Sequence, residues 1–245
     1  MQPDEYLKMA AVEDAMWYYR ALHAHLRWCL ENRQQLRKAD ILDAGCGSGG
    51  FLRRLRAARP QWNLTGVDLS PVACALARQR CDARIEPGSV TALPFADASF
   101  DAITSADVLY QLENPAAALA EFFRCLRPGG VVVVNVPAYM WLWSYHDEAV
   151  QSKHRYTRPE LTGLLRAAGF FVGLNTYWNT LPFPLLVLKR KVFPTGGATS
   201  DVRLYPAPLE AMFNGMMALE QAWLRAGWTL RFGSSVLAVG RKPGG

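Results

Sequence analysis

The sequence lacks the features that mark membrane and secreted proteins. Its 245 residues contain no run of about 18 uncharged apolar residues, the length that a membrane-spanning helix needs. The segment from Met1 to Glu5 has neither the basic nor the apolar region of a signal peptide. We therefore expect a cytoplasmic protein.

Paired cysteines are also missing. The five cysteines are an odd, scattered set without a CxxC pattern, which argues against a disulfide framework and against a zinc knuckle. We expect all of them to be reduced thiols.

Charge of one sign is not concentrated in a way that suggests nucleic-acid binding. The net charge is +6, but the basic residues are spread along the chain and form no stripe with aromatic residues. The one basic run, Lys189 to Lys191, follows an apolar stretch. We expect it to be the solvated end of a helix, with contact to a membrane surface as the less favoured alternative.

What is present is the pattern of an α/β protein. With 51% hydrophobic and 20% charged residues, the chain can fold as a single domain over residues 1–245. Short apolar runs alternate with segments of helical periodicity, as in strands that are buried on both faces of a parallel sheet. The runs lie at 41–44, 64–67, 100–104 and 131–136, and the helical segments at 50–58, 71–80 and 115–126.

The flanking segments predict further helices and two more strands. Apolar residues at helical spacing indicate one or two helices within 5–37, and another helix at 158–168 that ends at Gly169. An irregular insertion that becomes helical at 209–225 separates two expected strands, at 170–177 and 234–240.

A glycine-rich loop and a following aspartate carry the first functional signal. The loop from Asp43 to Gly50 joins a strand to a helix, where glycines allow a tight turn and close approach of a ligand. Asp68 ends the next strand and can accept hydrogen bonds from both hydroxyls of a ribose. The spacing also satisfies GxGxxG, so these residues alone leave a dinucleotide site open.

Four ordered motifs resemble those of the class I S-adenosylmethionine (SAM)-dependent methyltransferases, over residues 39–138. They are Asp43-Ala44-Gly45-Cys46-Gly47-Ser48-Gly49, Gly66-Val67-Asp68-Leu69-Ser70-Pro71, Ala92-Leu93-Pro94-Phe95 leading to Ser99-Phe100-Asp101, and Leu126-Arg127-Pro128-Gly129-Gly130. The resemblance implies a Rossmann-like sheet of seven strands, mostly parallel with one reversed strand near the end. Helices would cover both faces, with an N-terminal helical cap (1–38), the SAM-binding core (39–138) and an acceptor-side segment with inserted helices (139–245).

The resemblance also implies which residues would bind SAM and its product, S-adenosylhomocysteine. Asp43 would hold the methionine amino end and Asp68 the ribose, and the carbonyl of Ala106 would accept from the methionine ammonium. Many relatives have Asp where this chain has Ser89, which weakens or changes the adenine contact there. The full expected set is Tyr19, Arg20, Asp43, Gly45, Cys46, Gly47, Gly49, Asp68, Leu69, Ser89, Val90 and Ala106, and Asp107 to Gln111 would border the reaction site.

The chemistry of SAM agrees with these residue types. SAM is a sulfonium cation with a charged amino-acid tail, so its pocket needs hydrogen-bond acceptors and no pyrophosphate cradle. Methyl transfer is an in-line displacement, and holding nucleophile, methyl group and sulfur collinear can supply much of the catalysis. A dedicated base is therefore not required by the reaction itself.

Two outer segments resemble a narrower branch, bacterial methyltransferases linked to glycan, lipid-linked and secondary metabolism. They are Trp17-Tyr18-Tyr19-Arg20, and His146-Asp147 followed by His154-Arg155-Tyr156-Thr157. Relatives have additional arginines where this chain has Leu22 and His23. The aromatic residues of the first segment are either ordinary core or a lid over the site.

The second segment supplies the candidate catalytic residues: His146, Asp147, His154 and Tyr156. A histidine with a pKa near 6.5 suits removal of a proton from a hydroxyl or ammonium group. The alternative is a structural network in which Asp and His pair with Arg155 or Arg158. Two His and one Asp could also ligate a divalent ion, but no further acidic cluster supports this, and we expect no metal.

The expected substrate is a small molecule with a hydrophobic part. Its pocket should lie under residues 16–20, 139–156 and 177–215, which are rich in aromatic and apolar side chains. Alternatives are an NAD(P)-dependent oxidoreductase, a SAM-binding protein with a non-methylating reaction (cyclase or decarboxylase type), and a methyltransferase acting on a membrane lipid.

Overall fold

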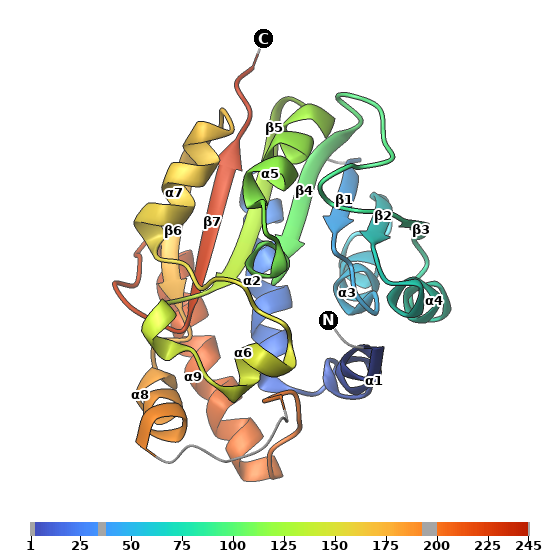
Figure 1. The fold of residues 1–245 in the computed structure, drawn as a ribbon. Helices are drawn as coiled ribbons and strands as arrows, with labels where there is room; N and C mark the ends of the chain where they lie inside the picture. Colours follow the sequence, from blue (N-terminus) through green and yellow to red (C-terminus); the bar gives the residue numbers. More distant parts are fainter. Residues whose placement is uncertain (1–2, 34–37, 193–199, 245) are drawn as a thin grey trace.

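The computed structural model describes residues 3–33, 38–192 and 200–244, and its central element is a seven-stranded sheet (Figure 1). The strand order is β3-β2-β1-β4-β5-β7-β6. The strands are β1 (Asp40–Ala44), β2 (Asn63–Asp68), β3 (Arg84–Pro87), β4 (Phe100–Ala106), β5 (Leu126–Pro137), β6 (Phe171–Trp178) and β7 (Ser235–Arg241).

The sheet is parallel except for one strand. The first five strands pair in parallel, whereas β7 runs antiparallel to both β5 and β6. This confirms the expected Rossmann-like fold with a reversed strand near the end. The sequence patterns located six of the seven strands and missed β3.

Helices cover both faces of the sheet and one of its ends. They are α1 (Pro3–Val12), α2 (Trp17–Arg33), α3 (Gly50–Ala58), α4 (Pro71–Arg80), α5 (Pro115–Cys125), α6 (Tyr145–Ala149), α7 (Arg158–Ala167), α8 (Phe183–Val187) and α9 (Ala207–Arg225), with short turns η1 (Leu109–Gln111), η2 (Met140–Leu142) and η3 (Leu188–Val192). The expected N-terminal helical segment is thus two helices. Its last residues, 34–37, and those of the insertion at 193–199 lie outside the described residues.

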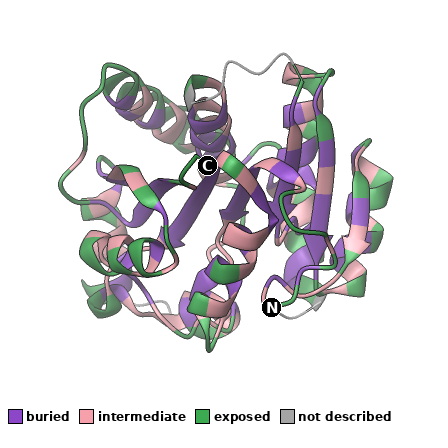
Figure 2. Cartoon of the chain, turned by 90° about the horizontal axis from the view of Figure 1, so that it is seen from above, coloured by how far each residue is buried: buried purple, intermediate pink, exposed green. Residues whose placement is uncertain are grey.

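Alternate residues of the strands face two separate cores. Val131 and Val133 pack with α2, α3 and α9 on one face, and Val132 and Val134 pack with α5 and α7 on the other. The view along the strands shows the buried sheet between the two helical layers (Figure 2). This two-sided burial explains why β5 contains four consecutive valines, Val131 to Val134.

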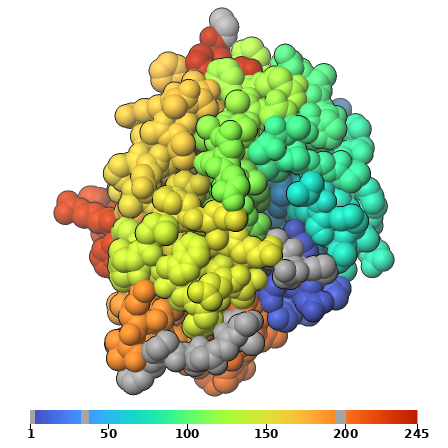
Figure 3. All heavy atoms as spheres, viewed as in Figure 1, coloured from blue at the N-terminus to red at the C-terminus, as the bar shows by residue number. Residues whose placement is uncertain are grey.

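The carboxyl ends of the parallel strands meet at one end of the molecule. There, α1, α6 and α8 surround the strand ends, while the C-terminus lies at the opposite end (Figure 1). In the space-filling view, the yellow-green segment that follows β5 lies over this end, next to the orange α8 (Figure 3). Across the described ranges, no helix is both long and apolar enough to traverse a bilayer.

Candidate functional site

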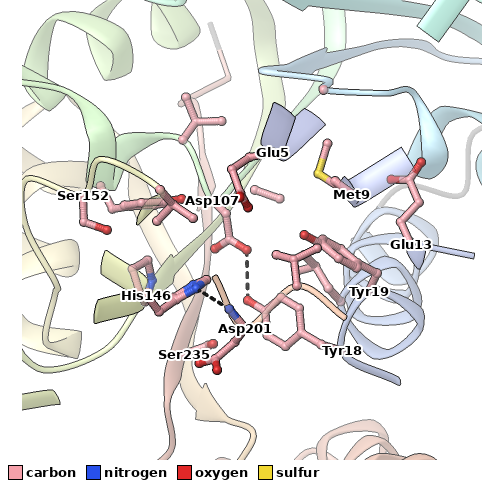
Figure 4. A pocket seen from close by; sticks show the side chains of 18 of the residues that line it. Glu5, Met9, Glu13, Tyr18, Tyr19, Asp107, His146, Ser152, Asp201 and Ser235 are labelled. Atoms are coloured by element: carbon pink, nitrogen blue, oxygen red, sulfur yellow. Dashed lines mark hydrogen bonds between the residues drawn. The ribbon is translucent and has the colours of Figure 1, made fainter. Parts of the chain in front are cut away.

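A cavity of about 440 Å³ lies at the carboxyl ends of β1, β2, β4 and β5. Asp43, Asp68, Ala106 and Pro137 stand at or near these strand ends, and all four line it. Open α/β sheets bind ligands at this position, where the strand order reverses. Residues of α1, α2, α6 and η3 also line the cavity, so it extends beyond the glycine loop and Asp68. Figure 4 shows Glu5 of α1, Tyr18 of α2 and His146 of α6 around it.

The glycine loop forms one wall of the cavity. Gly45 has φ +86°, and a Cβ built on it would lie 2.2 Å from Val108 Cγ2, so any other residue would be strained there and would have to displace Val108. Gly45, Cys46 and Gly47 all line the cavity. Gly49 does not: it has φ +80° at the start of α3, and its backbone packs against Ala77 and Cys81. We therefore correct the expected role of Gly49 from ligand contact to packing.

Backbone N–H groups, one of them from the glycine loop, bind the carboxylate of Asp68. Its Oδ2 accepts from the backbone N–H of Gly47 at 2.9 Å, and its Oδ1 accepts from that of Ser70 at 2.9 Å. The Tyr6 hydroxyl of α1 also donates to Oδ1, at 3.4 Å. A carboxylate oxygen can accept more than one hydrogen bond, so Asp68 keeps capacity for ligand hydroxyls.

Asp43 is a buried carboxyl group with a raised pKa. Burial, together with the neighbouring charges of Asp68 and Glu13, raises the pKa of Asp43 to about 7, although Thr104 donates a hydrogen bond at 2.7 Å. Burial also raises the pKa of Asp68. This end of the cavity therefore has the electrostatic character of a cation site.

Leu69, Ser89 and Val90 line the cavity next to Asp68. Leu69 is 75% exposed, an unusual state for a large apolar side chain, and it is available to stack on a flat ligand. Ser89 hydrogen bonds with Thr91, and Val90 is buried. The three residues that the resemblance assigns to the adenine thus line the same cavity.

The N-terminal helices bring residues to the cavity that sequence patterns did not identify. Glu5, Tyr6 and Met9 of α1 line it, in addition to Trp17, Tyr18 and the expected Tyr19 of α2. Arg20, a member of the expected SAM-binding set, is instead exposed and lies outside the cavity lining. Helical geometry explains this, because Arg20 follows Tyr19 by about 100° around the helix.

Asp107 lies at the centre of the cavity (Figure 4). It has φ +54°, an uncommon backbone conformation for aspartate. Its Oδ2 accepts from Tyr18 OH at 2.9 Å and its Oδ1 from Asn135 Nδ2 at 2.8 Å. Trp178 Nε1 in turn donates to Asn135 at 2.7 Å. Burial raises the pKa of Asp107 to about 6.

His146 is the expected catalytic residue whose ring faces the cavity (Figure 4). Its Nδ1 accepts from the backbone N–H of Asp201 at 3.1 Å. Burial and the charge of Arg190 lower the pKa of His146 to about 4, so the ring is neutral at pH 7. The ring proton is then on Nε2, which can donate a hydrogen bond to a ligand but cannot remove a proton from it.

The other expected catalytic residues have structural surroundings. His154 is 40% exposed in its side chain, 3.8 Å from Glu160, and lies outside the cavity lining. Tyr156 is buried, and its hydroxyl donates to the Leu109 carbonyl at 3.2 Å. Asp147 lines the cavity but forms a buried ion pair with Arg155 at 2.6 Å. For these residues the structure favours the network alternative over direct catalysis.

The basic run at 189–191 was expected to be a solvated helix end, and the structure shows that this expectation is wrong. Arg190 is only 8% exposed, and its Nη2 donates to Asp201 Oδ2 at 2.8 Å. Lys189 lines the cavity and donates to Asp201 and Tyr205. Lys191 is exposed and donates to the Trp143 carbonyl at 3.1 Å, whereas Asp201 pairs with the other two.

Comparison with known proteins places the site in a family. Residues 42–134 match the family model described as a methyltransferase domain. The malonyl-[acyl-carrier protein] O-methyltransferase of Erwinia pyrifoliae is 41% identical over 219 residues, covering 83% of this chain and 80% of that protein. The demethylmenaquinone methyltransferase of Deinococcus radiodurans is 38% identical over 99 residues, covering 38% of this chain and 41% of that protein. Several relatives are matched over only 30% to 52% of their own length.

Solved structures share the fold at low sequence identity. An S-adenosylmethionine dependent methyltransferase from Mesorhizobium loti has a TM-score of 0.61 at 18% identity, covering 94% of this chain and 100% of that chain. The [4+2]-cyclase SpnF has a TM-score of 0.59 at 20% identity, covering 90% and 81%. The Erwinia relative and the ordered motifs establish the family, and the solved structures share its fold. The chain therefore belongs to the class I SAM-dependent methyltransferase family.

Proposed function

We propose that this protein transfers the methyl group of SAM to a small-molecule acceptor that has a hydrophobic part. The observation that carries the proposal is that one cavity joins two unlike regions. Asp43, Asp68 and the glycine loop form one end, and aromatic and aliphatic side chains of α2, α8 and α9 form the other. A cationic cofactor and an apolar methyl acceptor would therefore meet near the centre.

The residues at the first end fit SAM. Asp68 would accept hydrogen bonds from the ribose hydroxyls, and Asp43 would lie near the methionine ammonium. Leu69, Ser89 and Val90 would contact the adenine. Two buried carboxyl groups with raised pKa values match a ligand that carries positive charge on its sulfonium and ammonium groups. SAM would supply the methyl electrophile, and the glycine loop would hold it.

The residues at the second end fit an apolar group. Trp17, Leu185, Leu186 and Phe213 line the cavity there, and the rings of Trp17 and Phe213 lie 5.0 Å apart. Two relatives carry names that refer to demethylmenaquinone and to malonyl-[acyl-carrier protein]. An acceptor from glycan, lipid-linked or secondary metabolism is consistent with this wall.

Two groups near the centre could act on the methyl acceptor. His146 Nε2 can donate a hydrogen bond that orients the acceptor. Asp107 has a raised pKa of about 6, which suits a carboxylate that takes a proton from a hydroxyl or ammonium group. Both residues would contribute mainly by positioning the methyl acceptor, because in-line displacement depends on the alignment of the attacking atom with the methyl group and the sulfur.

Calorimetric titration with SAM and with NAD tests the cofactor assignment. We expect SAM to bind and NAD not to bind, and the reverse result would contradict the proposal. Incubation with SAM and a panel of acceptors should then yield S-adenosylhomocysteine in equal amount to methylated product. Product formation without S-adenosylhomocysteine would indicate the non-methylating alternative.

The affinity for SAM should depend on pH below neutrality. Because the pKa of Asp43 is raised to about 7 and cationic SAM favours its ionised form, a proton must leave Asp43 when SAM binds at lower pH. The affinity should therefore fall as the pH drops below 7, by up to about tenfold per pH unit. Calorimetry between pH 5 and 8 measures this, and Asp43→Asn should flatten the profile.

His146 and His154 should differ in their effect on turnover. Replacing His146 by Phe removes a hydrogen-bond donor from the cavity, so turnover should fall about tenfold or more while SAM affinity stays nearly constant. His154→Phe is the matched control and should leave turnover nearly unchanged, because this ring lies at the surface. Equal losses in the two variants would contradict the placement of the two rings.

A further inference from the structure

A group of charged side chains forms the wall of the cavity at the methyl-acceptor end. Two come from α6, one from the segment after it, two from η3 and one from the segment before α9. All six line the cavity, and we call them the charged cluster: His146, Asp147, Arg155, Lys189, Arg190 and Asp201.

The charged cluster contains more positive than negative charge. Arg155, Lys189 and Arg190 are three cations, whereas Asp147 and Asp201 are the only carboxylates among its six members. His146 adds no charge at pH 7, because its pKa is lowered to about 4 by burial. One positive charge of the charged cluster therefore has no counterpart within it.

Two further carboxylates line the cavity with the charged cluster. Glu5 pairs with Lys8 at 2.6 Å through Oε1. Asp107 accepts hydrogen bonds from Tyr18 and Asn135, and burial raises its pKa to about 6 overall, although the charge of Arg155 lowers that pKa. Asp107 therefore offsets part of the surplus positive charge, and the two guanidinium groups keep the rest at the cavity wall.

Arg155 keeps one nitrogen for a ligand. Its Nε donates to the Ala138 carbonyl at 2.9 Å and its Nη1 to Asp147 Oδ1 at 2.6 Å. Within the described ranges, Nη2 makes no hydrogen bond to the protein, although the side chain is only 3% exposed and lines the cavity. A buried guanidinium with an unused donor is expected to have a partner in the working enzyme.

Fewer nitrogens of Arg190 than of Arg155 have a hydrogen-bond partner. Only Nη2 of Arg190 has one, Asp201, whereas Nε and Nη1 have none among the described residues. Nη1 lies 4.0 Å from Asp147 Oδ2, beyond hydrogen-bond distance. The side chain is 6% exposed, so water does not replace these partners freely.

We propose that the methyl acceptor carries an oxyanion, a carboxylate or a phosphate, and that Arg155 and Arg190 bind it. This inference rests on the proposed function and adds a chemical class to the acceptor. The oxyanion would neutralise surplus positive charge and accept from Arg155 Nη2, which guanidinium groups do well for both anions. Arg190 lines the cavity, but its Nε and Nη1 are closed to solvent, so it would attract the oxyanion by its charge. The apolar part of the acceptor would lie on Leu185, Leu186 and Phe213.

The opposite charges of the two ends would also orient the reactants. Asp43 and Asp68 attract the cationic cofactor to one end, and the charged cluster attracts the anionic acceptor to the other. The methyl acceptor would then be excluded from the cofactor end by repulsion from the carboxylates.

Thermal unfolding in the presence of small oxyanions tests the site without knowledge of the acceptor. The protein saturated with S-adenosylhomocysteine is melted in acetate, in inorganic phosphate and in chloride at equal ionic strength. Phosphate also stabilises proteins by exclusion from their surface, so the measure is the difference between variants. We expect a larger rise of the midpoint temperature in acetate or phosphate for the wild type than for Arg190→Gln.

Lys191→Gln is the matched control, because Lys191 is exposed and follows Arg190 in the sequence, and its replacement removes the same charge. It should behave like the wild type. If Arg190→Gln fails to fold, Arg155→Lys keeps the charge but loses the Nη2 donor, and it should also show a smaller rise. An equal rise in the variant that folds and in Lys191→Gln would overturn the proposal.

Titrations with octanoate, octyl phosphate and octanamide separate the two anion classes from apolar binding alone. The wild type should prefer octanoate or octyl phosphate to octanamide by about tenfold, and Arg190→Gln should lose that preference. S-adenosylhomocysteine affinity must stay unchanged in Arg190→Gln; a loss would assign the guanidinium to the cofactor carboxylate and overturn the proposal. Absence of S-adenosylhomocysteine binding by the wild type would instead contradict the proposed function itself.

Discussion

Replacement of Asp147 by alanine should lower the free energy of unfolding by about 3–5 kcal/mol, because the change leaves a buried guanidinium without its partner. Asp147 Oδ1 accepts from Arg155 Nη1 at 2.6 Å, and the two side chains are 1% and 3% exposed. The same carboxylate caps α6 through the backbone N–H of Ser144 at 3.0 Å. Its loss would also leave Asp201 alone to balance three cations.

Urea unfolding of Asp147→Ala and of Glu148→Ala measures this effect. Glu148 is the next residue on α6 and is exposed, so its replacement should change the stability by less than about 0.5 kcal/mol. Adding Arg155→Met to Asp147→Ala should restore part of the stability, since the double variant buries no unpaired charge. A loss below about 1 kcal/mol in Asp147→Ala would show that water or another group compensates Arg155.

The core of the fold was predictable because its strands are buried on both faces. An uninterrupted apolar run such as Val131 to Val134 predicts a buried strand when segments of helical periodicity lie before and after it. β3 lacks such a run: of Arg84 to Pro87 only Ile85 is buried, because the strand lies at the edge of the sheet. An edge strand of four residues leaves no periodic pattern to read.

The cofactor end of the site was predictable for a similar reason. Asp43, Gly45 and Asp68 lie at or directly after the ends of β1 and β2. The local sequence that predicts these strands therefore also predicts where the three residues lie. Gly49 was misassigned because glycine serves both ligand approach and packing, and only the contact with Ala77 and Cys81 distinguishes the two.

The methyl-acceptor end was less predictable because its contacts join distant segments. The pairing of Arg190 with Asp201 buries a basic run that looked solvated. His146 and His154 are of one residue type within one segment, yet only the hydrogen bond from Asp201 and the fold of α6 place His146 in the cavity. Neither distinction has a local sequence signal.

Asp68→Ala should weaken SAM binding about 10- to 150-fold, which corresponds to the loss of about 1.5–3 kcal/mol from hydrogen bonds to a charged group. Asp68 is 6% exposed, and its carboxylate lies at the end of β2 within the cavity. Calorimetric titration with SAM at pH 8, where Asp43 is ionised, measures the effect of Asp68 alone.

Two consequences of this substitution have to be separated, since Asp68 also accepts from the Gly47 and Ser70 backbone N–H groups. The midpoint temperature of the protein without SAM reports the loss of these internal bonds. Tyr6→Phe removes the other donor to Asp68 but leaves the carboxylate in place, so SAM affinity should stay constant or rise as the ribose hydroxyls gain that oxygen. An affinity of Asp68→Ala within twofold of the wild type, with a lowered midpoint temperature, would restrict Asp68 to holding the glycine loop. A loss of affinity that greatly exceeds the loss of stability would instead assign the carboxylate to the ribose.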